Sequence, residues 1–218
     1  MLIIFDLDDT LIDTSGSITP IKLERALQKM VEAGFQTVSF KESLELLKRL
    51  DELASNGGKA LAEFVEMHDA DPSFYEIGIK ELYDNICFDA PIFSVDQAVE
   101  TLSDLRISHQ LALVTIGNPT QQYEKMKKAG IDSTMFSKIV ITEEKNKKIY
   151  YQAIVAELGV IPTDVLVCGD KIEVDLSPAK ELGFKTVHMC FGRGKNSLGL
   201  KEDVDYTITR LSQIKELI

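Results

Sequence analysis

The stretch IIFDLDDT, from Ile3 to Thr10, decides the fold because it joins a short apolar run directly to closely spaced acids. Residues 1–5 suit a strand that is buried on both faces. A carboxylate at the end of such a strand is costly to bury unless a metal ion or hydrogen bonds satisfy it. If the strand belongs to a parallel sheet, Asp6 and Asp8 lie where open α/β sheets bind their ligands. The stretch alone also fits a plain acidic turn, so the rest of the chain must decide.

The composition indicates a globular protein with a small-molecule partner. The chain has 218 residues, of which 44% are hydrophobic and 27% charged, enough for a core domain plus a smaller one. Its net charge of −11 argues against nucleic-acid and anionic-membrane partners and favours a small substrate. Cys87, Cys168 and Cys190 show no metal-binding spacing, which is typical of reduced thiols in a cytoplasmic protein. The oligomeric state stays open.

Residues 15–94 show helical periodicity throughout. Thr19-Pro20 indicates a helix start, Ser39 and Glu42 fit a capping box, and the Asn-Gly-Gly run at 56–58 is typical of a helix end. Amphipathic helices joined by short turns predict a small bundle.

The rest of the chain alternates strands with helices. Alternation at this length predicts βαβ units and a parallel sheet, to which residues 2–5 also belong. The fold class is therefore α/β, with a core domain of residues 1–14 and 95–218 and a helical domain of residues 15–94 inserted after the first strand. The expected strands are 111–115, 138–141, 165–168, 185–189 and 206–208, and the expected helices are 95–106, 119–129, 146–158, 174–182 and 211–217.

Polar residues follow the expected strands where each strand ends. Thr115 is followed by Gly117 and Asn118-Pro119, so a hydroxyl stands beside backbone N–H groups and a helix start, which suits a phosphate. The lysine-containing run 145–148 supplies a cation after the next strand. Each segment alone also fits a plain turn or a solvated face. Their order along one sheet edge is harder to explain in that way.

A second acidic segment follows the strand at 165–168. It reads Gly-Asp-Lys-Ile-Glu-Val-Asp, from Gly169 to Asp175. Carboxylates from two strand ends can then converge at one edge of the sheet. The run Gly192 to Lys195 lacks the spacing of a P-loop and is interpreted as a surface loop after a strand.

These segments together resemble the four motifs of the haloacid dehalogenase (HAD) superfamily. Residues 6–11 match its first motif, and Thr115 with Gly117-Asn118 matches the second. Lys145 resembles the third motif, and Gly169-Asp170 with Asp175 resembles the fourth. The resemblance implies a Rossmann-like sheet flanked by helices, and the helical insert resembles the type C1 cap that closes over the active site.

Two positions stay open within this resemblance. The third motif lacks the proline that often follows its lysine, so Lys148 is the alternative to Lys145. In the fourth motif, Glu173 is the alternative to Asp175 as the second acid near the metal. Asp175-Leu176 before a helix fits the family pattern better.

The resemblance implies a phosphoryl-transfer chemistry that the residue types support. Asp6 is the expected nucleophile, and Asp8 the acid that protonates the leaving group and later deprotonates water. Mg²⁺ prefers oxygen ligands, which Asp6, the backbone carbonyl of Asp8, Asp170 and Asp175 offer. The expected ligands of the phosphoryl oxygens are Thr115, Gly117, Asn118 and Lys145.

The second acid also separates branches of the family. A halide leaving group needs no proton, so the presence of both Asp6 and Asp8 favours a phosphohydrolase or phosphomutase over a dehalogenase. The leading hypothesis is a Mg²⁺-dependent phosphatase acting on a small phosphorylated metabolite. The alternatives are a phosphomutase of the β-phosphoglucomutase kind and a non-catalytic ligand-binding member of the family.

Overall fold

The computed structural model describes residues 1–83 and 90–218 and divides into two compact units. The core unit consists of Met1–Thr14 and Pro91–Ile218, and the helical unit of Ser15–Ala90. The helical unit was expected to extend to residue 94. The returning chain instead joins the core earlier, because the N–H of Asp13 donates to the carbonyl of Phe93 (2.9 Å) and the N–H of Val95 donates to that of Leu11 (2.9 Å).

The core unit contains a six-stranded parallel sheet, which confirms the predicted α/β class. Its strands lie in the order β3-β2-β1-β4-β5-β6, with β1 between β2 and β4. Chain order reverses across β1, so the loops that follow β1, β2 and β4 diverge at a topological switch point, where such sheets bind ligands. The strands are β1 (Leu2–Phe5), β2 (Gln110–Ile116), β3 (Lys138–Thr142), β4 (Val165–Gly169), β5 (Lys185–Met189) and β6 (Tyr206–Ile208).

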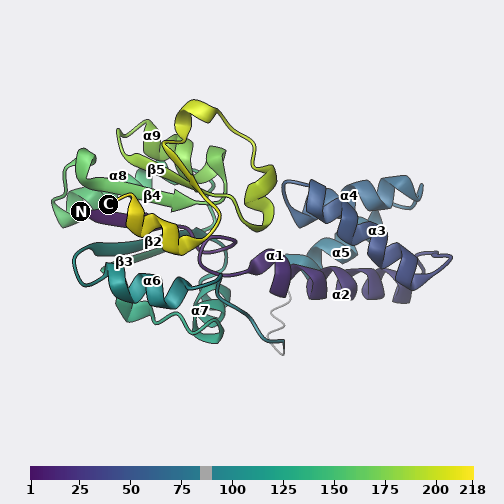
Figure 1. The fold of residues 1–218 in the computed structure, drawn as a ribbon. Helices are drawn as coiled ribbons and strands as arrows, with labels where there is room; N and C mark the ends of the chain where they lie inside the picture. The colour runs from purple at the N-terminus through teal and green to yellow at the C-terminus, as the bar shows by residue number, and fades with distance from the viewer. Residues whose placement is uncertain (84–89) are drawn as a thin grey trace. The chain divides into compact units, whose positions relative to one another are not determined.

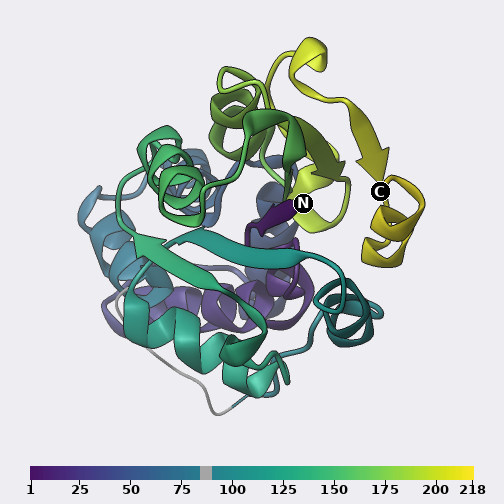
Figure 2. The ribbon, with the colours of Figure 1, turned by 90° about the vertical axis from the view of Figure 1, so that its left-hand side faces the viewer.

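Helices cover both faces of this sheet. Helices α6 (Ala98–Leu105) and α7 (Pro119–Lys128) lie on one face, and α8 (Lys148–Leu158) and α9 (Ser177–Lys180) on the other (Figure 1). The expected helix 174–182 is a π-helical segment, Ile172–Leu176, followed by the short α9, and the expected helix 211–217 is a 3₁₀ segment, Leu211–Glu216. Figure 2 shows the two helical layers on either side of the strands. The remaining short helical turns are Ser133–Met135, Pro162–Asp164, Gly192–Asn196 and Lys201–Asp203.

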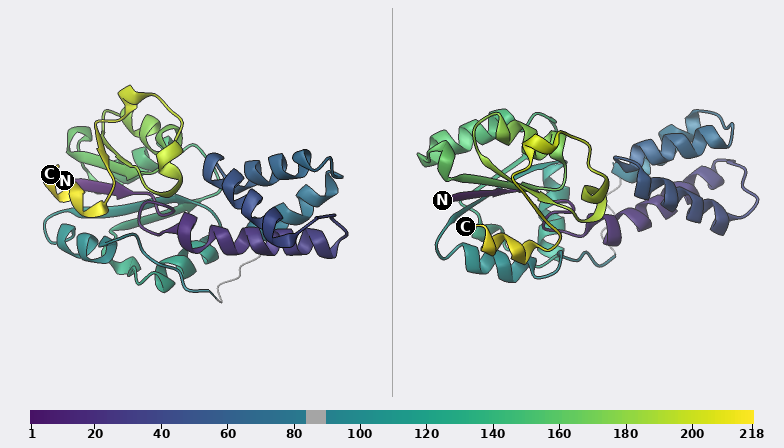
Figure 3. Two further views of the ribbon diagram at one scale, coloured as in Figure 1. Left: turned by 45° about the vertical axis from the view of Figure 1, so that its right-hand side comes forward. Right: turned by 45° about the horizontal axis from the view of Figure 1, so that its top comes forward.

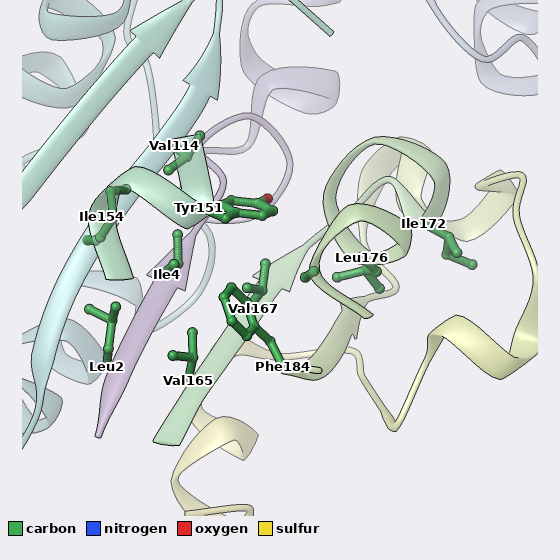
Figure 4. Close-up of a cluster of buried hydrophobic side chains, with 12 residues drawn as sticks. Leu2, Ile4, Val114, Tyr151, Ile154, Val165, Val167, Ile172, Leu176 and Phe184 are labelled. Atoms are coloured by element: carbon green, nitrogen blue, oxygen red, sulfur yellow. The ribbon is translucent and has the colours of Figure 1, made fainter. Parts of the chain in front are cut away.

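One face of the sheet packs against α8 and the π-helical segment through an apolar cluster. Leu2 and Ile4 of β1, which are inaccessible to solvent, point into it together with Val167 of β4 (Figure 4). Tyr151 and Ile154 of α8 close the cluster from the helix side, each 1% exposed. Burial of aliphatic and aromatic side chains on this scale stabilises the sheet by roughly 1.5–3 kcal/mol per large side chain, so the ends of β1, β2 and β4 are rigidly placed.

The second unit consists of helices joined by short connections (Figure 3). Ser39 accepts from the N–H of Glu42 (3.4 Å) at the start of α3, as expected. Asn56 does not end a helix but caps the next one, accepting from the N–H of Lys59 (3.0 Å). The helix start indicated by Thr19-Pro20 is present, with Thr19 as the first residue of α2 and Ile18 before it. The helices are α1 (Thr14–Ser17, shared with the core unit), α2 (Thr19–Glu32), α3 (Phe40–Leu53), α4 (Gly57–Met67) and α5 (Ser73–Tyr83).

The apolar character of the helices and the state of the cysteine thiols are two further features of the fold. In the part of the chain that the structure describes, no helix has the length and apolar character needed to cross a bilayer. Cys168 and Cys190 are free thiols, and Cys87 lies outside the described residues.

Candidate active site

The site is built around Asp6, which follows the central strand directly. The backbone N–H of Asp6 donates to the carbonyl of Cys168 (3.0 Å), so the pairing of β1 with β4 continues to this residue and fixes its position. Its carboxylate Oδ1 lies 2.6 Å from Nζ of Lys147. The same ammonium group lies 2.6 Å from Oδ1 of Asp175 and 2.8 Å from the carbonyl of Val114. All three N–H donors of Lys147 therefore have acceptors in the core.

The structure places Lys147, rather than Lys145 or Lys148, beside Asp6. Lys145 is exposed, and Nζ of Lys148 pairs with Glu181 (2.6 Å). Lys147, which the motif resemblance did not include, is 1% exposed and reaches Asp6. The reason lies in the helix that follows. Lys147 stands four and seven residues before the buried Tyr151 and Ile154 of α8, so it extends the buried face of that helix towards the sheet edge. That periodicity is the sequence signal that identifies it.

Three buried carboxylates meet beside this lysine. Asp6, Asp170 and Asp175 each offer an oxygen atom within 4.8 Å of those of the other two. Asp175 is placed by the π-helical segment, a rare element that often occurs at functional sites. Its Oδ2 accepts from the N–H of Lys171 (2.9 Å). Glu173 is exposed, so the structure brings Asp175 to this cluster and leaves Glu173 outside it.

Close packing around the cluster depends on two glycines. A Cβ atom on Gly169 would lie 2.5 Å from the Asp175 side chain. A Cβ on Gly194 would lie 2.3 Å from the carbonyl of Met189 and 3.2 Å from Cβ of Asp170. The run 192–195, expected to be a surface loop, is therefore a 3₁₀ turn packed against the acids. His188 of β5 adds a contact from Nε2 to the carbonyl of Asp170 (3.1 Å), which the sequence analysis also missed.

Burial sets the electrostatics of the cluster. Burial raises the pKa of Asp6 to about 6 from 3.8, although the charge of Lys147 opposes the shift. Burial also raises the pKa of Asp170 well above its usual value, against the attraction of Lys171. Oδ1 of Asp170 is buried and has no hydrogen-bond partner among the described residues. Three clustered acids, two of which share Lys147, and an unsatisfied carboxylate oxygen fit a hard divalent cation such as Mg²⁺.

Asp8 lies in a different environment from Asp6. Its Oδ1 accepts from the hydroxyl of Thr14 and from Nζ of Lys125 (2.8 Å). Its Oδ2 accepts from Nε2 of Gln122 (3.0 Å) and from the same Nζ (3.0 Å). Burial raises the pKa of Asp8, but the charge of Lys125 and these hydrogen bonds outweigh it and hold the pKa well below its usual range. Both oxygens of the Asp8 carboxylate therefore accept hydrogen bonds from neighbouring side chains.

The second motif is only partly arranged as expected. Thr115 is 1% exposed, and its hydroxyl oxygen accepts from Nε2 of Gln122 (2.9 Å). The N–H of Gly117 donates to the carbonyl of Thr142 (2.8 Å), so that group is not available to a phosphate. Asn118 is exposed, and its Oδ1 caps α7 by accepting from the N–H of Gln121 (3.3 Å).

The fold and the site together define a class of enzyme. A buried aspartate at the switch point of a parallel sheet, beside a lysine and a pair of acids suited to a divalent cation, is equipped to act on an anionic substrate. A second carboxylate two residues on supplies a group for proton transfer. The arrangement fits a hydrolase that acts on an anionic substrate.

Comparison with known proteins identifies the family. Residues 1–183 match the model of the haloacid dehalogenase-like hydrolases. The chain belongs to this family, and the prediction of an enzyme of its phosphoric monoester hydrolase branch is confirmed. It is 30% identical to a glyceraldehyde 3-phosphate phosphatase of Pyrococcus furiosus over 229 residues, covering 100% of this chain and 92% of that one. The similarity to the enzyme of the same name from Methanocaldococcus jannaschii is 29% over 224 residues, covering 99% and 96%.

Solved structures share the fold at lower sequence identity. A predicted phosphoglycolate phosphatase from Haemophilus somnus superposes with a TM-score of 0.71 at 19% identity, covering 99% of this chain and 96% of that one. A putative HAD-hydrolase from Bacillus subtilis, YfnB, solved with bound magnesium, gives 0.66 at 17%, covering 99% and 97%. These likenesses support the Rossmann-like fold.

Proposed function

We propose that this protein is a Mg²⁺-dependent phosphatase that hydrolyses a small phosphorylated metabolite through an aspartyl-phosphate at Asp6. The observation that carries the proposal is that Asp6 lies beside both Lys147 and the acids Asp170 and Asp175, with Asp8 two residues away in sequence. Relatives that are 29% and 30% identical to this chain are glyceraldehyde 3-phosphate phosphatases, so a three-carbon phosphorylated aldehyde is the first substrate to assay.

The first half of the reaction transfers the phosphoryl group to the protein. A carboxylate oxygen of Asp6 attacks phosphorus, a new O–P bond forms, and the bond from phosphorus to the substrate oxygen breaks. Asp8, in its protonated form, gives its proton to that oxygen, so the product leaves as an alcohol. In the second half, water attacks phosphorus, Asp8 takes a proton from it, and the bond between phosphorus and Asp6 breaks. Inorganic phosphate leaves and both acids return to their starting forms.

Charge on the phosphoryl oxygens must be balanced throughout. Lys147 is the cation nearest the nucleophile and takes the role first given to Lys145. Thr115 presents a hydroxyl at the end of β2, and Asn118 stands at the start of α7, where backbone N–H groups favour anions. A preorganised ammonium and hydroxyl stabilise charge as it shifts during transfer.

The acid cluster is the proposed magnesium site. Asp6, the backbone carbonyl of Asp8 and Asp170 would hold the ion, with Asp175 beside them as a further acid. The ion supplies positive charge that offsets the repulsion between a carboxylate nucleophile and a phosphate dianion. The buried, unsatisfied Oδ1 of Asp170 supports this assignment.

Replacement of the nucleophile tests the proposal. Asp6→Asn keeps the shape of the side chain but removes its nucleophilic oxygen, so Mg²⁺-dependent hydrolysis of both an aryl phosphate and glyceraldehyde 3-phosphate should fall by at least about 10³-fold. The wild-type protein, quenched in acid during turnover and digested, should carry a phosphoryl group on the peptide that contains Asp6. The matched control Asp13→Asn changes a neighbouring acid outside the cluster and should stay within about twofold of wild type. Normal turnover by Asp6→Asn would refute the mechanism.

Product analysis with a hexose 1-phosphate tests the phosphomutase alternative. A mutase would convert a hexose 1-phosphate to its isomer faster than it releases inorganic phosphate. Product analysis by ³¹P NMR distinguishes the two, because the isomer and free phosphate give separate signals.

A further inference from the structure

A pair of polar residues on α7 surrounds Asp8 and has no part in the function proposed above. Gln122 and Lys125 are three residues apart, so they project from the same side of the helix. Gln122 is inaccessible to solvent and Lys125 is 9% exposed. A lysine is rarely buried without a partner of opposite charge, and the partner here is Asp8.

The contacts fix the Asp8 carboxylate in two ways. Nζ of Lys125 lies 2.8 Å from Oδ1 and 3.0 Å from Oδ2 of Asp8, so it contacts both carboxylate oxygens and fixes the position of the carboxylate. Nε2 of Gln122 lies 3.0 Å from Oδ2 alone, so it sets the rotation of the carboxylate plane. Both donors come from one helix and move as one body. We propose that Lys125 and Gln122 are positioning residues that hold Asp8 for both of its proton transfers, an inference that rests on the proposed function.

Gln122 also holds a second group. Its Nε2 lies 2.9 Å from Oγ1 of Thr115 and 3.1 Å from the carbonyl of Ile116. Gly117 leaves room for this side chain, because a Cβ atom there would lie 3.1 Å from its Cδ. Gln122 thus links the proton-transfer group to the hydroxyl proposed to hold phosphate, whereas Lys125 contacts the Asp8 carboxylate through its ammonium group. The two residues should therefore give different kinetic signatures.

Leaving-group chemistry separates positioning of Asp8 from general damage to the site. A 4-nitrophenolate leaves as a stable anion without a proton, so with this substrate only the hydrolysis of the phosphoenzyme depends on Asp8. An alkoxide leaving group needs a proton, so with an alkyl phosphate both half-reactions depend on Asp8. A misplaced acid–base group should slow the dependent steps and leave the others unchanged.

Rapid mixing of the Mg²⁺-loaded protein with each substrate tests the proposal through Lys125→Met. With 4-nitrophenyl phosphate, the first turnover should release nitrophenolate within about threefold of the wild-type rate, and the following steady state should be about 10–100-fold slower. With glyceraldehyde 3-phosphate, kcat should fall about 10²-fold with KM within about twofold and no burst. Lys127→Met removes an exposed lysine from the same helix and should match wild type within about twofold.

A second variant keeps the test decisive if Lys125→Met fails to fold. Gln122→Met should show the same slow second step and, because Thr115 loses its donor, a KM raised about 5–10-fold. The proposal is overturned if either variant slows the first nitrophenolate turnover as much as the steady state, or if Lys125→Met behaves like Lys127→Met. A wild-type protein that never carries a phosphoryl group on Asp6 would instead overturn the proposed function, and with it this role.

Discussion

Asp6 and Asp8 are two residues apart on one loop, yet the fold gives them opposite surroundings. Asp6 lies among acids, where burial and the charges of Asp175 and Asp8 raise its pKa to about 6 despite the attraction of Lys147. Asp8 also loses solvation, but Lys125 and its hydrogen bonds hold its pKa well below the usual range. Identical side chains are thus separated in proton affinity by their neighbours alone.

The difference originates in the two helical layers. Lys147 directly precedes α8 on one face of the sheet, and Lys125 lies on α7 on the other (Figure 1). At the carboxyl edge of the sheet, Lys147 therefore pairs with Asp6 from one face and Lys125 pairs with Asp8 from the other. In the metal-free protein these shifts run against the proposed roles, because a nucleophilic carboxylate must be ionised and a general acid protonated. A divalent cation bound beside Asp6 would favour its ionised form. At Asp6, the charge of Lys147 does not offset burial and the neighbouring acids, which suits a site for a divalent cation. At Asp8, Lys125 and the hydrogen bonds do offset burial.

Removal of the Asp6 lysine should have the largest effect. Lys147→Met takes away the cation beside the nucleophile and leaves Asp6 and Asp175 buried with no ammonium between them. We expect kcat/KM for glyceraldehyde 3-phosphate to fall about 10³-fold, since one preorganised donor contributes about 10²–10³ and its charge adds to that. Steady-state assays with saturating Mg²⁺ measure it. Lys145→Met is the control and should change kcat/KM by less than twofold; a larger loss there than in Lys147→Met would restore Lys145 to the site.

The stability of the metal-free protein should depend on pH through Asp6. Its folded-state pKa of about 6 lies above the value of 3.8 that it has when unfolded, so ionised Asp6 opposes folding above pH 6, and this cost disappears as the pH falls towards 4. Asp6→Asn removes the charge. In EDTA it should raise the free energy of unfolding by up to about 3 kcal/mol at pH 7.5 and by little at pH 4. Urea unfolding at the two pH values measures this. A less stable Asp6→Asn at pH 7.5 would mean that attraction to Lys147 exceeds the cost of burial.

Much of this site was predictable because strand ends converge by topology. A parallel sheet brings the residues after β1, β2 and β4 to one edge, so Asp6, Thr115, Asp170 and Asp175 could be placed together from their order in the sequence alone. The alternation of strands with helices predicted the parallel sheet, whereas the order of its strands comes from the structure. The lysine of the run 145–148 that turns inward was not predicted, although the buried face of α8 indicates Lys147.

The missed residues share a physical cause. Gln122, Lys125 and Lys147 are polar side chains on buried helix faces, and a pattern analysis assigns polar residues to the solvent face. Their signal is nonetheless present. Gln122 and Lys125 occupy the same stripe of α7 as the buried Met126 and Ala129, and polar residues within an apolar stripe indicate a partner in the core. That partner lies more than a hundred positions away in sequence, so only the fold reveals it.

Removal of the unsatisfied acid should separate metal binding from structure. Asp170→Asn eliminates a buried carboxylate whose pKa burial raises strongly, so we expect activity to fall about 10²-fold and the thermal stabilisation by millimolar Mg²⁺ to disappear. In EDTA the variant should be at least as stable as wild type. Glu173→Gln is the matched control, because this acid is exposed. Scanning calorimetry with and without Mg²⁺ distinguishes them, and loss of the Mg²⁺ shift in Glu173→Gln would place the second acid there.

The smallest expected effect concerns the Asp8 side. Thr14→Val removes one hydroxyl that donates to the carboxylate while Lys125 and Gln122 stay in place, so it should lower the free energy of unfolding at pH 7 by about 1–1.5 kcal/mol. Thr10 supplies the control. Its Oγ1 is buried without a partner among the described residues, so Thr10→Val should be neutral or stabilising. Chemical denaturation of both variants measures the difference. If Thr14→Val were neutral as well, the Asp8 carboxylate would be held by α7 alone, and the contrast with Asp6 would rest entirely on Lys125 and Gln122.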